Sequence, residues 1–257
     1  MLSRRSLVIA RAGMKLVLTD PAPMVTTIVM PLLLGAFLIP NAKATLIQRG
    51  WPNATGSEHV IPGMAVLFAF FGITMIGTLF FREHAWGTWD RLRASSASSL
   101  DLMVGKLAPL YLCYLIQMAL LFTLGHFIFG YQPTGSLVAL GVVLVVLTTV
   151  LVCFGAMLVA VFATMDQALT VGSVAGMVMA GIGGALAPAS TLPGWIQPIA
   201  KLVPPYWALQ ALEKITLQSA QLRDVAVNIL VLLGFAVLFA IVALLRFRAG
   251  DQKVGTT

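Results

Sequence analysis

One segment of this sequence, Phe81–Lys106, gathers charged, hydroxyl and tryptophan side chains between two long apolar runs: FREHAWGTWDRLRASSASSLDLMVGK. Trp86, Trp89 and Leu92 recur at helical spacing, which predicts a short amphipathic helix with an apolar stripe. Tryptophan and arginine are frequent anchors of protein interfaces, and charged side chains fix the orientation of a partner. Recognition of another protein is one interpretation of this pattern. A solvated surface helix with tryptophans at the lipid headgroups is an alternative interpretation of the same pattern.

The rest of the sequence offers little catalytic chemistry. His59 and His84 lie in different connections between apolar runs, and His126 lies alone inside one, so a metal-binding cluster is not predicted. Ser173 lacks the flanking pattern of an activated nucleophile. The GxxxxGK[ST] loop that cradles nucleotide phosphates does not occur. We therefore expect this chain to have no catalytic residue and to bind no metal or cofactor.

The composition indicates that lipid is the solvent for most of the chain. Of the 257 residues, 59% are hydrophobic and only 10% are charged, against about 25% charged in soluble domains. The formal net charge of +7 then points to anionic lipid, because nucleic acid would require a contiguous basic face with interleaved aromatic side chains. Cys113 and Cys153 both lie in apolar runs, where they are expected to be inert.

Six charge-free runs are close to the ~20 residues that a helix needs to cross the hydrocarbon layer. We therefore expect a single domain over residues 1–257 that is all-α and crosses the membrane several times (polytopic). None of the six runs contains Asp, Glu, Lys or Arg. Ion-coupled carriers usually keep such residues in mid-membrane, so this class is disfavoured. The predicted spans are Pro21–Ala42, Ile61–Phe81, Leu107–Phe129, Leu137–Ala163, Gln167–Ala187 and Val225–Leu245.

The positions of lysine and arginine orient the chain in the membrane. With both termini in the cytoplasm, eleven of the 16 basic residues lie on the cytoplasmic side, where basic residues of short loops concentrate. Residues 1–20 are too charged to span, and their periodicity predicts an amphipathic helix lying in the cytoplasmic interface, in contact with membrane lipid. Ser3-Arg4-Arg5-Ser6 resembles the start of a twin-arginine export signal, but charged residues interrupt the apolar core that such a signal needs.

The polar segment also carries an ordered pattern of residues. Its order is Arg82-Glu83, Gly87-Thr88, Asp90-Arg91-Leu92, Ala94-Ser95, Ser98, Leu100-Asp101-Leu102 and Gly105-Lys106. This order resembles the type-2 ATP-binding-cassette (ABC) export permeases. The similarity extends over the whole chain, because six spans, an interfacial N-terminal helix and a proline- and aromatic-rich segment before the last span also match. Ala85 and Ser96 depart from the pattern, since the family often has a second Glu and usually a Pro there.

The resemblance implies a type-2 ABC exporter fold and a role for each part. By this resemblance, residues 82–101 form the cytoplasmic coupling helix region. This region is expected to dock on a separate ATPase subunit, which binds ATP and magnesium. Two such subunits are implied, together with a second permease copy, identical or related. The implied location is the plasma (inner) membrane of a prokaryote. The residues assigned to the ATPase contact are Glu83, Trp86, Gly87, Thr88, Trp89, Asp90, Arg91, Leu92 and Arg93.

A stripe of small residues runs through the fifth predicted span. It repeats every four residues, a spacing that lets two helix backbones approach closely. One interpretation is packing within the subunit; the resemblance implies instead that this helix lies at the interface between two permease copies. Both interpretations remain open at this point. The stripe consists of Gly172, Gly176, Ala180 and Gly184.

The segment 188–224 before the last span is rich in proline and aromatic residues. A loop of this length without secondary structure is uncommon, so we expect short helices that dip partway into the outer leaflet. The resemblance implies that Trp195, Tyr206 and Trp207 roof the exit of a transport pathway, whereas anchoring at the lipid headgroups explains the same aromatic residues.

The expected function is that of a permease subunit that exports an amphipathic or hydrophobic substrate, such as a drug, an antibiotic or a lipid-like molecule. The apolar spans favour such a substrate, because no charged group is available in them to select a small ion. Export of a polysaccharide or lipid-linked glycan is the first alternative. A structural membrane protein without a transport role is the second.

Overall fold

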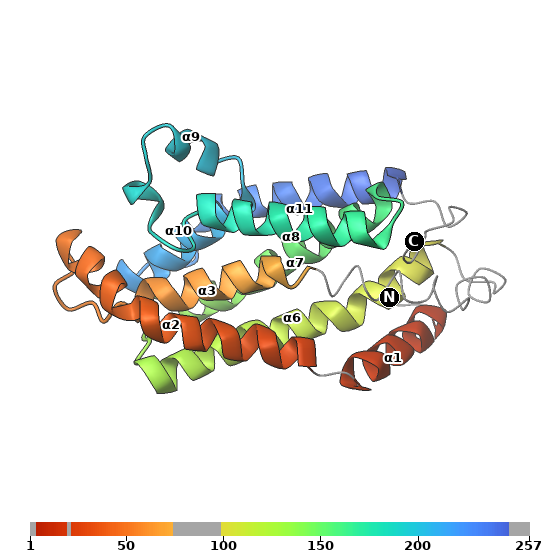
Figure 1. Cartoon of the computed structure of the whole chain (residues 1–257), viewed down its shortest axis with the longest axis horizontal. Helices are drawn as coiled ribbons and strands as arrows, with labels where there is room; N and C mark the ends of the chain where they lie inside the picture. Colours follow the sequence, from red (N-terminus) through yellow and green to blue (C-terminus); the bar gives the residue numbers. More distant parts are fainter. Residues whose placement is uncertain (1–3, 20–21, 74–98, 247–257) are drawn as a thin grey trace.

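The computed structural model describes residues 4–19, 22–73 and 99–246. In these ranges the chain folds into helices joined by turns, and Figure 1 shows an elongated bundle with α1 at one end and α9 and α10 at the other. The elements are α1 (Arg4–Thr19), α2 (Ala22–Gln48), α3 (Ser57–Phe71), α6 (Ser99–Phe129), α7 (Leu137–Val161), α8 (Met165–Ile182), the 3-10 turn η1 (Ala189–Thr191), α9 (Ile196–Ala200), α10 (Pro204–Leu217) and α11 (Ala226–Arg246).

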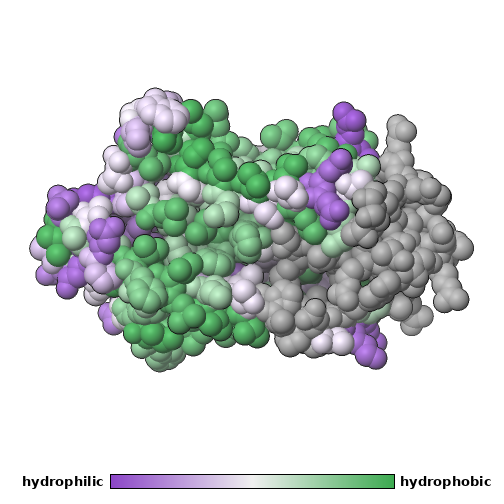
Figure 2. All heavy atoms as spheres, in the orientation of Figure 1, coloured by the Kyte–Doolittle hydropathy of each residue, from purple (hydrophilic) through white to green (hydrophobic). Residues whose placement is uncertain are grey.

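Five of the described helices are long and apolar enough to cross a membrane: α2, α6, α7, α8 and α11. The shorter apolar helix α3 covers the first part of the second predicted span, Ile61–Phe81, of which residues 74–81 lie outside the described ranges. Figure 2 shows apolar side chains over the middle of the visible face of the bundle, with polar side chains gathered towards its two ends. The prediction of an all-helical, polytopic membrane fold is confirmed.

Helix α7 forms the centre of the bundle. It packs on α11, α6 and α10, and Val143, Leu147 and Val150 are fully buried along it. A helix that is hydrophobic on every side is stable only where other apolar elements or lipid surround it. The Phe154 ring lies 5.1 Å from the Phe239 ring of α11, measured between centroids. This core fixes the helices that carry the polar end of the molecule.

Helices α3 and α8 approach each other closely enough for backbone to touch backbone. A Cβ atom added at Gly176 of α8 would lie 2.8 Å from the backbone oxygen of Phe70 on α3. Near the other end of the contact, a Cβ at Gly63 of α3 would lie 2.2 Å from the backbone oxygen of Ala185. Glycine at both positions is what permits this distance.

Several helices extend beyond the predicted spans. Helix α2 continues past Ala42 to Gln48 and includes Lys43, and the membrane-spanning part of α6 begins at Met103 and contains Lys106, which is 1% exposed. Helix α8 contains Asp166. The charge-free runs are therefore parts of longer helices, and the charged residues lie in the parts of these helices outside the predicted spans. A helix continues wherever its backbone hydrogen bonds can form, whereas an apolar run marks only its most lipid-like part.

The limits of α8 show one correct and one incorrect boundary. Thr164 caps its start, close to the predicted limit at Gln167, because the side-chain oxygen accepts a hydrogen bond from the backbone N–H of Gln167 at 3.3 Å. The helix ends at Ile182, before the predicted limit at Ala187, and Gly184 lies in the following turn with φ of 102°. Glycine tolerates this left-handed conformation at little cost.

The α3–α8 contact predicts the effect of one added methyl group. Gly176→Ala should destabilise the purified protein by about 1–3 kcal/mol, because the new Cβ meets backbone of α3 that cannot turn aside. Gly181→Ala is the matched control on the same helix, where nothing lies within 4 Å of an added Cβ. Its effect should stay within about 0.5 kcal/mol. Thermal unfolding in detergent measures both, and equal destabilisation by the two variants contradicts the contact.

Candidate functional site

The residues predicted to contact an ATPase subunit, from Glu83 to Arg93, lie in the range 74–98 outside the described residues. The structure does place the helices that bracket this range. Helix α6 packs on α1, and Figure 1 shows the start of α6 and the last turn of α11 at the same end of the bundle as α1. The polar connection therefore joins α6 at that end. Its contact with an ATPase stays a prediction.

The small-residue stripe faces the interior of this chain over most of its length. Gly172, Gly176 and Ala180 are buried, and the first two face Ile73 and Phe70 of the preceding apolar segment. The described packing thus accounts for these three residues within one subunit. Gly184 is not part of this helix face, because it lies in the turn after α8. Contact of α8 with a second permease copy stays a prediction.

The aromatic residues predicted to form an exit roof lie at the end of the bundle opposite α1. Segment 188–224 contains the short helices η1, α9 and α10. Tyr206 and Trp207 lie together in the first turn of α10, with their ring centroids 5.5 Å apart and their planes at 88°, and Trp207 Nε1 donates a hydrogen bond to the Lys201 carbonyl at 2.9 Å. Trp195 lies apart in the preceding turn and is 70% exposed. Their role as a roof stays a prediction.

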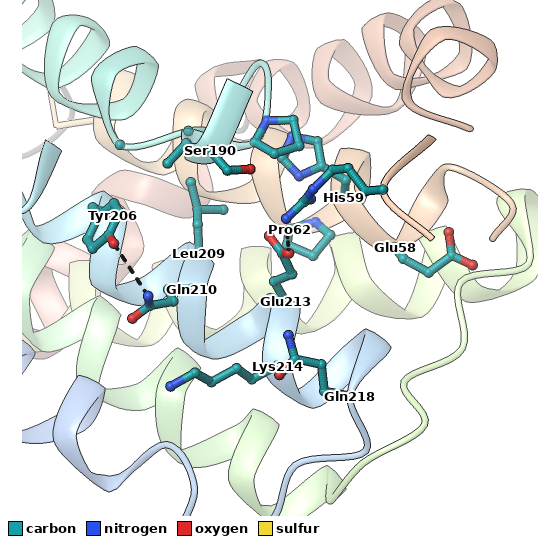
Figure 3. Close-up of a pocket in the computed structure, with 15 residues that line it drawn as sticks. Glu58, His59, Pro62, Ser190, Tyr206, Leu209, Gln210, Glu213, Lys214 and Gln218 are labelled. Carbon is teal, nitrogen blue, oxygen red and sulfur yellow. Dashed lines mark hydrogen bonds and ion pairs between the residues drawn. The ribbon is translucent and has the colours of Figure 1, made fainter. Parts of the chain in front are cut away.

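A polar cavity of about 200 Å³ lies next to these short helices (Figure 3). Four parts of the chain line it: the turn after α2, the first turns of α3, the segment after α8, and α10. The sequence analysis did not find this site, because its members are far apart along the chain. The charged and polar residues that line it are Arg49, Glu58, His59, Ser190, Tyr206, Gln210, Glu213, Lys214 and Gln218.

The two carboxylates of the cavity are both engaged. Glu213 Oε1 accepts a hydrogen bond from Arg49 Nη2 at 2.7 Å, which forms an ion pair between α10 and the turn after α2. The Glu58 carboxylate accepts from the backbone N–H groups of Thr55 and Gly56 at 3.1 and 2.8 Å. Glu58 therefore holds the turn that leads into α3, and Arg49 with Glu213 holds that turn against α10.

A hydrogen-bond network fixes the α10 wall of the cavity. Asn228 of α11, which is buried, accepts from Lys214 Nζ at 3.3 Å and donates to Gln210 Oε1 at 2.8 Å and to the Trp207 carbonyl at 3.1 Å. Gln210 Nε2 in turn donates to the Tyr206 hydroxyl at 3.4 Å. A buried polar network that is satisfied in this way holds its members in one arrangement.

His59 is an uncharged group in this cavity at neutral pH. It lies in the first turn of α3, before the apolar run that begins at Val60. Burial lowers the pKa of its imidazole to about 4, while the negative charge of Glu213 raises the pKa and the positive charge of Arg49 lowers it. His59 Nε2 and Arg49 Nη1 are both buried and have no hydrogen-bond partner among the described residues.

The chemistry of the cavity is that of a binding site. Within residues 4–19, 22–73 and 99–246, no group of three or more His, Cys, Asp or Glu side chains could hold a metal ion. The carboxylates are paired or hydrogen-bonded, and Arg49 and His59 each have one buried nitrogen atom without a hydrogen-bond partner among the described residues. The arrangement can therefore bind and orient a polar group.

The low pKa of His59 predicts a loss of stability in mild acid. The ordinary pKa is 6.5 and the folded value about 4, so the unfolded chain binds more protons between these values. Stability should fall as the pH drops below about 6.5, with the loss complete near pH 4. His59→Gln should reduce the fall in apparent melting temperature between about pH 7 and pH 5. His126→Gln, at an exposed histidine, is the control, and an unchanged fall in His59→Gln contradicts the assignment.

Comparison with known proteins places the chain in a family. Residues 47–245 match the family described as ABC-2 family transporter protein. The linearmycin resistance permease protein LnrN of Bacillus subtilis (strain 168) is 26% identical over 199 residues, which are 77% of this chain and 51% of that protein. The probable multidrug ABC transporter permease YbhR of Escherichia coli (strain K12) is 25% identical over 186 residues, 71% of this chain and 50% of that protein. The chain thus spans about half the length of these curated relatives. It belongs to the ABC-2 transporter family.

Proposed function

We propose that this chain is the permease subunit of an ATP-driven exporter and that a separate subunit hydrolyses the ATP. The family match over residues 47–245 carries this proposal. The absence of a GxxxxGK[ST] loop from the sequence supports it, because the chain then needs a partner to use ATP. ATP and magnesium bind to that partner, of which the assembly contains two copies.

The polar region 82–101 is the proposed contact with the ATPase. It follows α3 and leads into α6, at the end of the bundle where α1 lies. Trp86 and Trp89 serve as apolar anchors, and the neighbouring Asp90 and Arg91 fix the orientation of the docked subunit. Both termini and this region face the cytoplasm of a prokaryotic cell, in its inner membrane.

The proposed assembly contains two permeases, identical or related. The face of α8 that does not contact α3 exposes Val174, Met177 and Val178, and α2 exposes Phe37 and Leu33. Such apolar surfaces require lipid, a second copy of the chain or an apolar substrate against them. A cleft between two permeases, lined by the first, second and fifth spans, would use these same surfaces.

The proposed substrate is amphipathic or hydrophobic. The names of the relatives support this class, since one is a linearmycin resistance permease and another a probable multidrug permease. Export of a polysaccharide or lipid-linked glycan is the alternative substrate class, and a structural membrane protein without transport is the alternative role. The structural role requires no ATPase, so the search for an ATPase partner separates it from both kinds of exporter.

Co-purification from native membranes tests the proposal. A tagged full-length chain should bring with it a polypeptide that hydrolyses ATP. Trp89→Ala should weaken this association by about 30-fold, the effect of removing an interface anchor worth about 2 kcal/mol. The measurement is the amount of ATPase activity recovered per mole of tagged chain.

Trp195→Ala is the matched control, because it removes an exposed tryptophan at the opposite end of the bundle. It should leave the recovered ATPase activity unchanged. The proposal fails if the wild-type chain recovers no ATPase, and the assignment of the contact fails if Trp89→Ala recovers as much ATPase as the control does.

A further inference from the structure

The polar cavity lies between α3, α10 and the segment after α8, at the end of the bundle away from α1. It lies within a single chain, so no second permease is needed to complete it. Figure 3 shows side chains from three different parts of the chain, among them His59, Ser190 and Glu213, arranged around the same space. Its volume of about 200 Å³ is several times the roughly 30 Å³ that one water occupies in the liquid.

The charges that line the cavity balance one another. Arg49 and Glu213 form an ion pair at 2.7 Å. Glu58 accepts hydrogen bonds from backbone N–H groups, and Lys214 donates to Asn228 at 3.3 Å. Two basic side chains, Arg49 and Lys214, and two acidic ones, Glu58 and Glu213, line the cavity, so its formal charge is zero and a ligand with a full charge would leave it unbalanced. The cavity therefore favours a neutral ligand.

Two buried nitrogen atoms show which polar group fits. Arg49 Nη1 carries N–H donors only, whereas the neutral imidazole of His59 can accept a hydrogen bond at Nε2. Neither atom has a partner among the described residues, and a buried polar atom without a hydrogen bond costs about 1–3 kcal/mol. Hydroxyl groups offer what both atoms lack, because a hydroxyl oxygen accepts a hydrogen bond from an Arg49 N–H and a hydroxyl hydrogen is donated to a His59 nitrogen.

The remaining walls match a ring that bears several hydroxyl groups. Ser190, Tyr206 and Gln210 each offer both a donor and an acceptor. Pro62, Leu209 and other apolar residues line the cavity between them, where C–H groups of a ligand can pack. Placed polar groups that fix the orientation of a ligand, together with apolar contacts, are typical of small-molecule sites.

We propose that this cavity binds a neutral, hydroxyl-bearing group of about the size of one sugar ring, held by Arg49 and His59. The group is either a free polyol or the hydroxylated part of a membrane amphiphile. Both sources present the same chemistry to the cavity. The site does not depend on the ATPase partner. Failure to detect binding here would therefore leave the proposed function intact, and failure of the proposed function would leave this site intact.

Ligand-dependent stability of the full chain in phosphatidylcholine nanodiscs, without any ATPase, tests the site. The free probe is methyl β-D-glucoside, and a second set of nanodiscs contains monoglucosyl diacylglycerol. At ten times its dissociation constant, a bound probe should raise the apparent melting temperature by about 3 °C. Methyl phosphate and ethanolamine, one anionic and one cationic, should give smaller shifts at the same concentration.

Ser190→Trp is the variant that blocks the cavity. Ser190 is an exposed residue at its rim, so the substitution should leave the melting temperature without probe unchanged and abolish the shift. Asn53→Trp is the matched control, at an exposed residue of the same end that does not line the cavity. It should keep the full shift. His59→Leu should also abolish the shift.

Each outcome decides the proposal. A shift with methyl β-D-glucoside indicates a site for a free polyol, and a shift with the glucolipid alone indicates a site for part of an amphiphile; both support it. It is overturned if neither probe shifts the wild type, which means that water alone fills the cavity. It is also overturned if Ser190→Trp shifts as much as Asn53→Trp, or if a charged probe gives the larger shift.

Discussion

The backbone contact between α3 and α8 is the constraint on which the arrangement of both ends of the molecule depends. Gly63 meets Ala185, and Gly176 meets Phe70, at distances that leave no room for a side chain. The first turns of α3 carry Glu58 and His59 of the polar cavity, and its other end leads to the polar segment. Because the two backbones touch, a shift of α3 along its axis would displace the turn after α8 that forms another wall of the cavity.

Hydrogen bonds between spans supplement this apolar packing. Gln117 of α6, which is buried, donates through Nε2 to the Thr27 carbonyl of α2 at 3.3 Å. Tyr111 of α6 pairs its hydroxyl with that of Thr149 on α7 at 3.2 Å. Such bonds are worth on average about 0.6 kcal/mol within a membrane. They fix the positions of helices that lipid and apolar packing alone would leave free to slide.

The sequence was sufficient to predict five helices that are long and apolar enough to cross a membrane, because a run without charged residues is a strong signal in a membrane chain. It did not give the full length of the helices, since α6 begins at Ser99, before the charge-free run that starts at Leu107, and includes Lys106. The sequence pattern also predicted that the small-residue repeat extends along the helix to Gly184, whereas the structure has Gly184 in a turn. The polar cavity was not predictable, since Arg49 and Glu213 are 164 positions apart. The available signal was only that charged residues are scarce in this chain, so that those between apolar runs are expected to have partners.

The two ends of the bundle thus have different tasks in our account. One end has a rigid polar cavity, and the other receives the polar connection that leads into α6, proposed to take mechanical work from a separate ATPase. A photo-crosslinking amino acid at position 89, activated in the native cells, tests this claim most directly. We predict a crosslink to an ABC ATPase, identified by mass spectrometry. Crosslinks confined to the permease itself, or modification of a cysteine at position 89 by a membrane-impermeant reagent added outside intact cells, would contradict it.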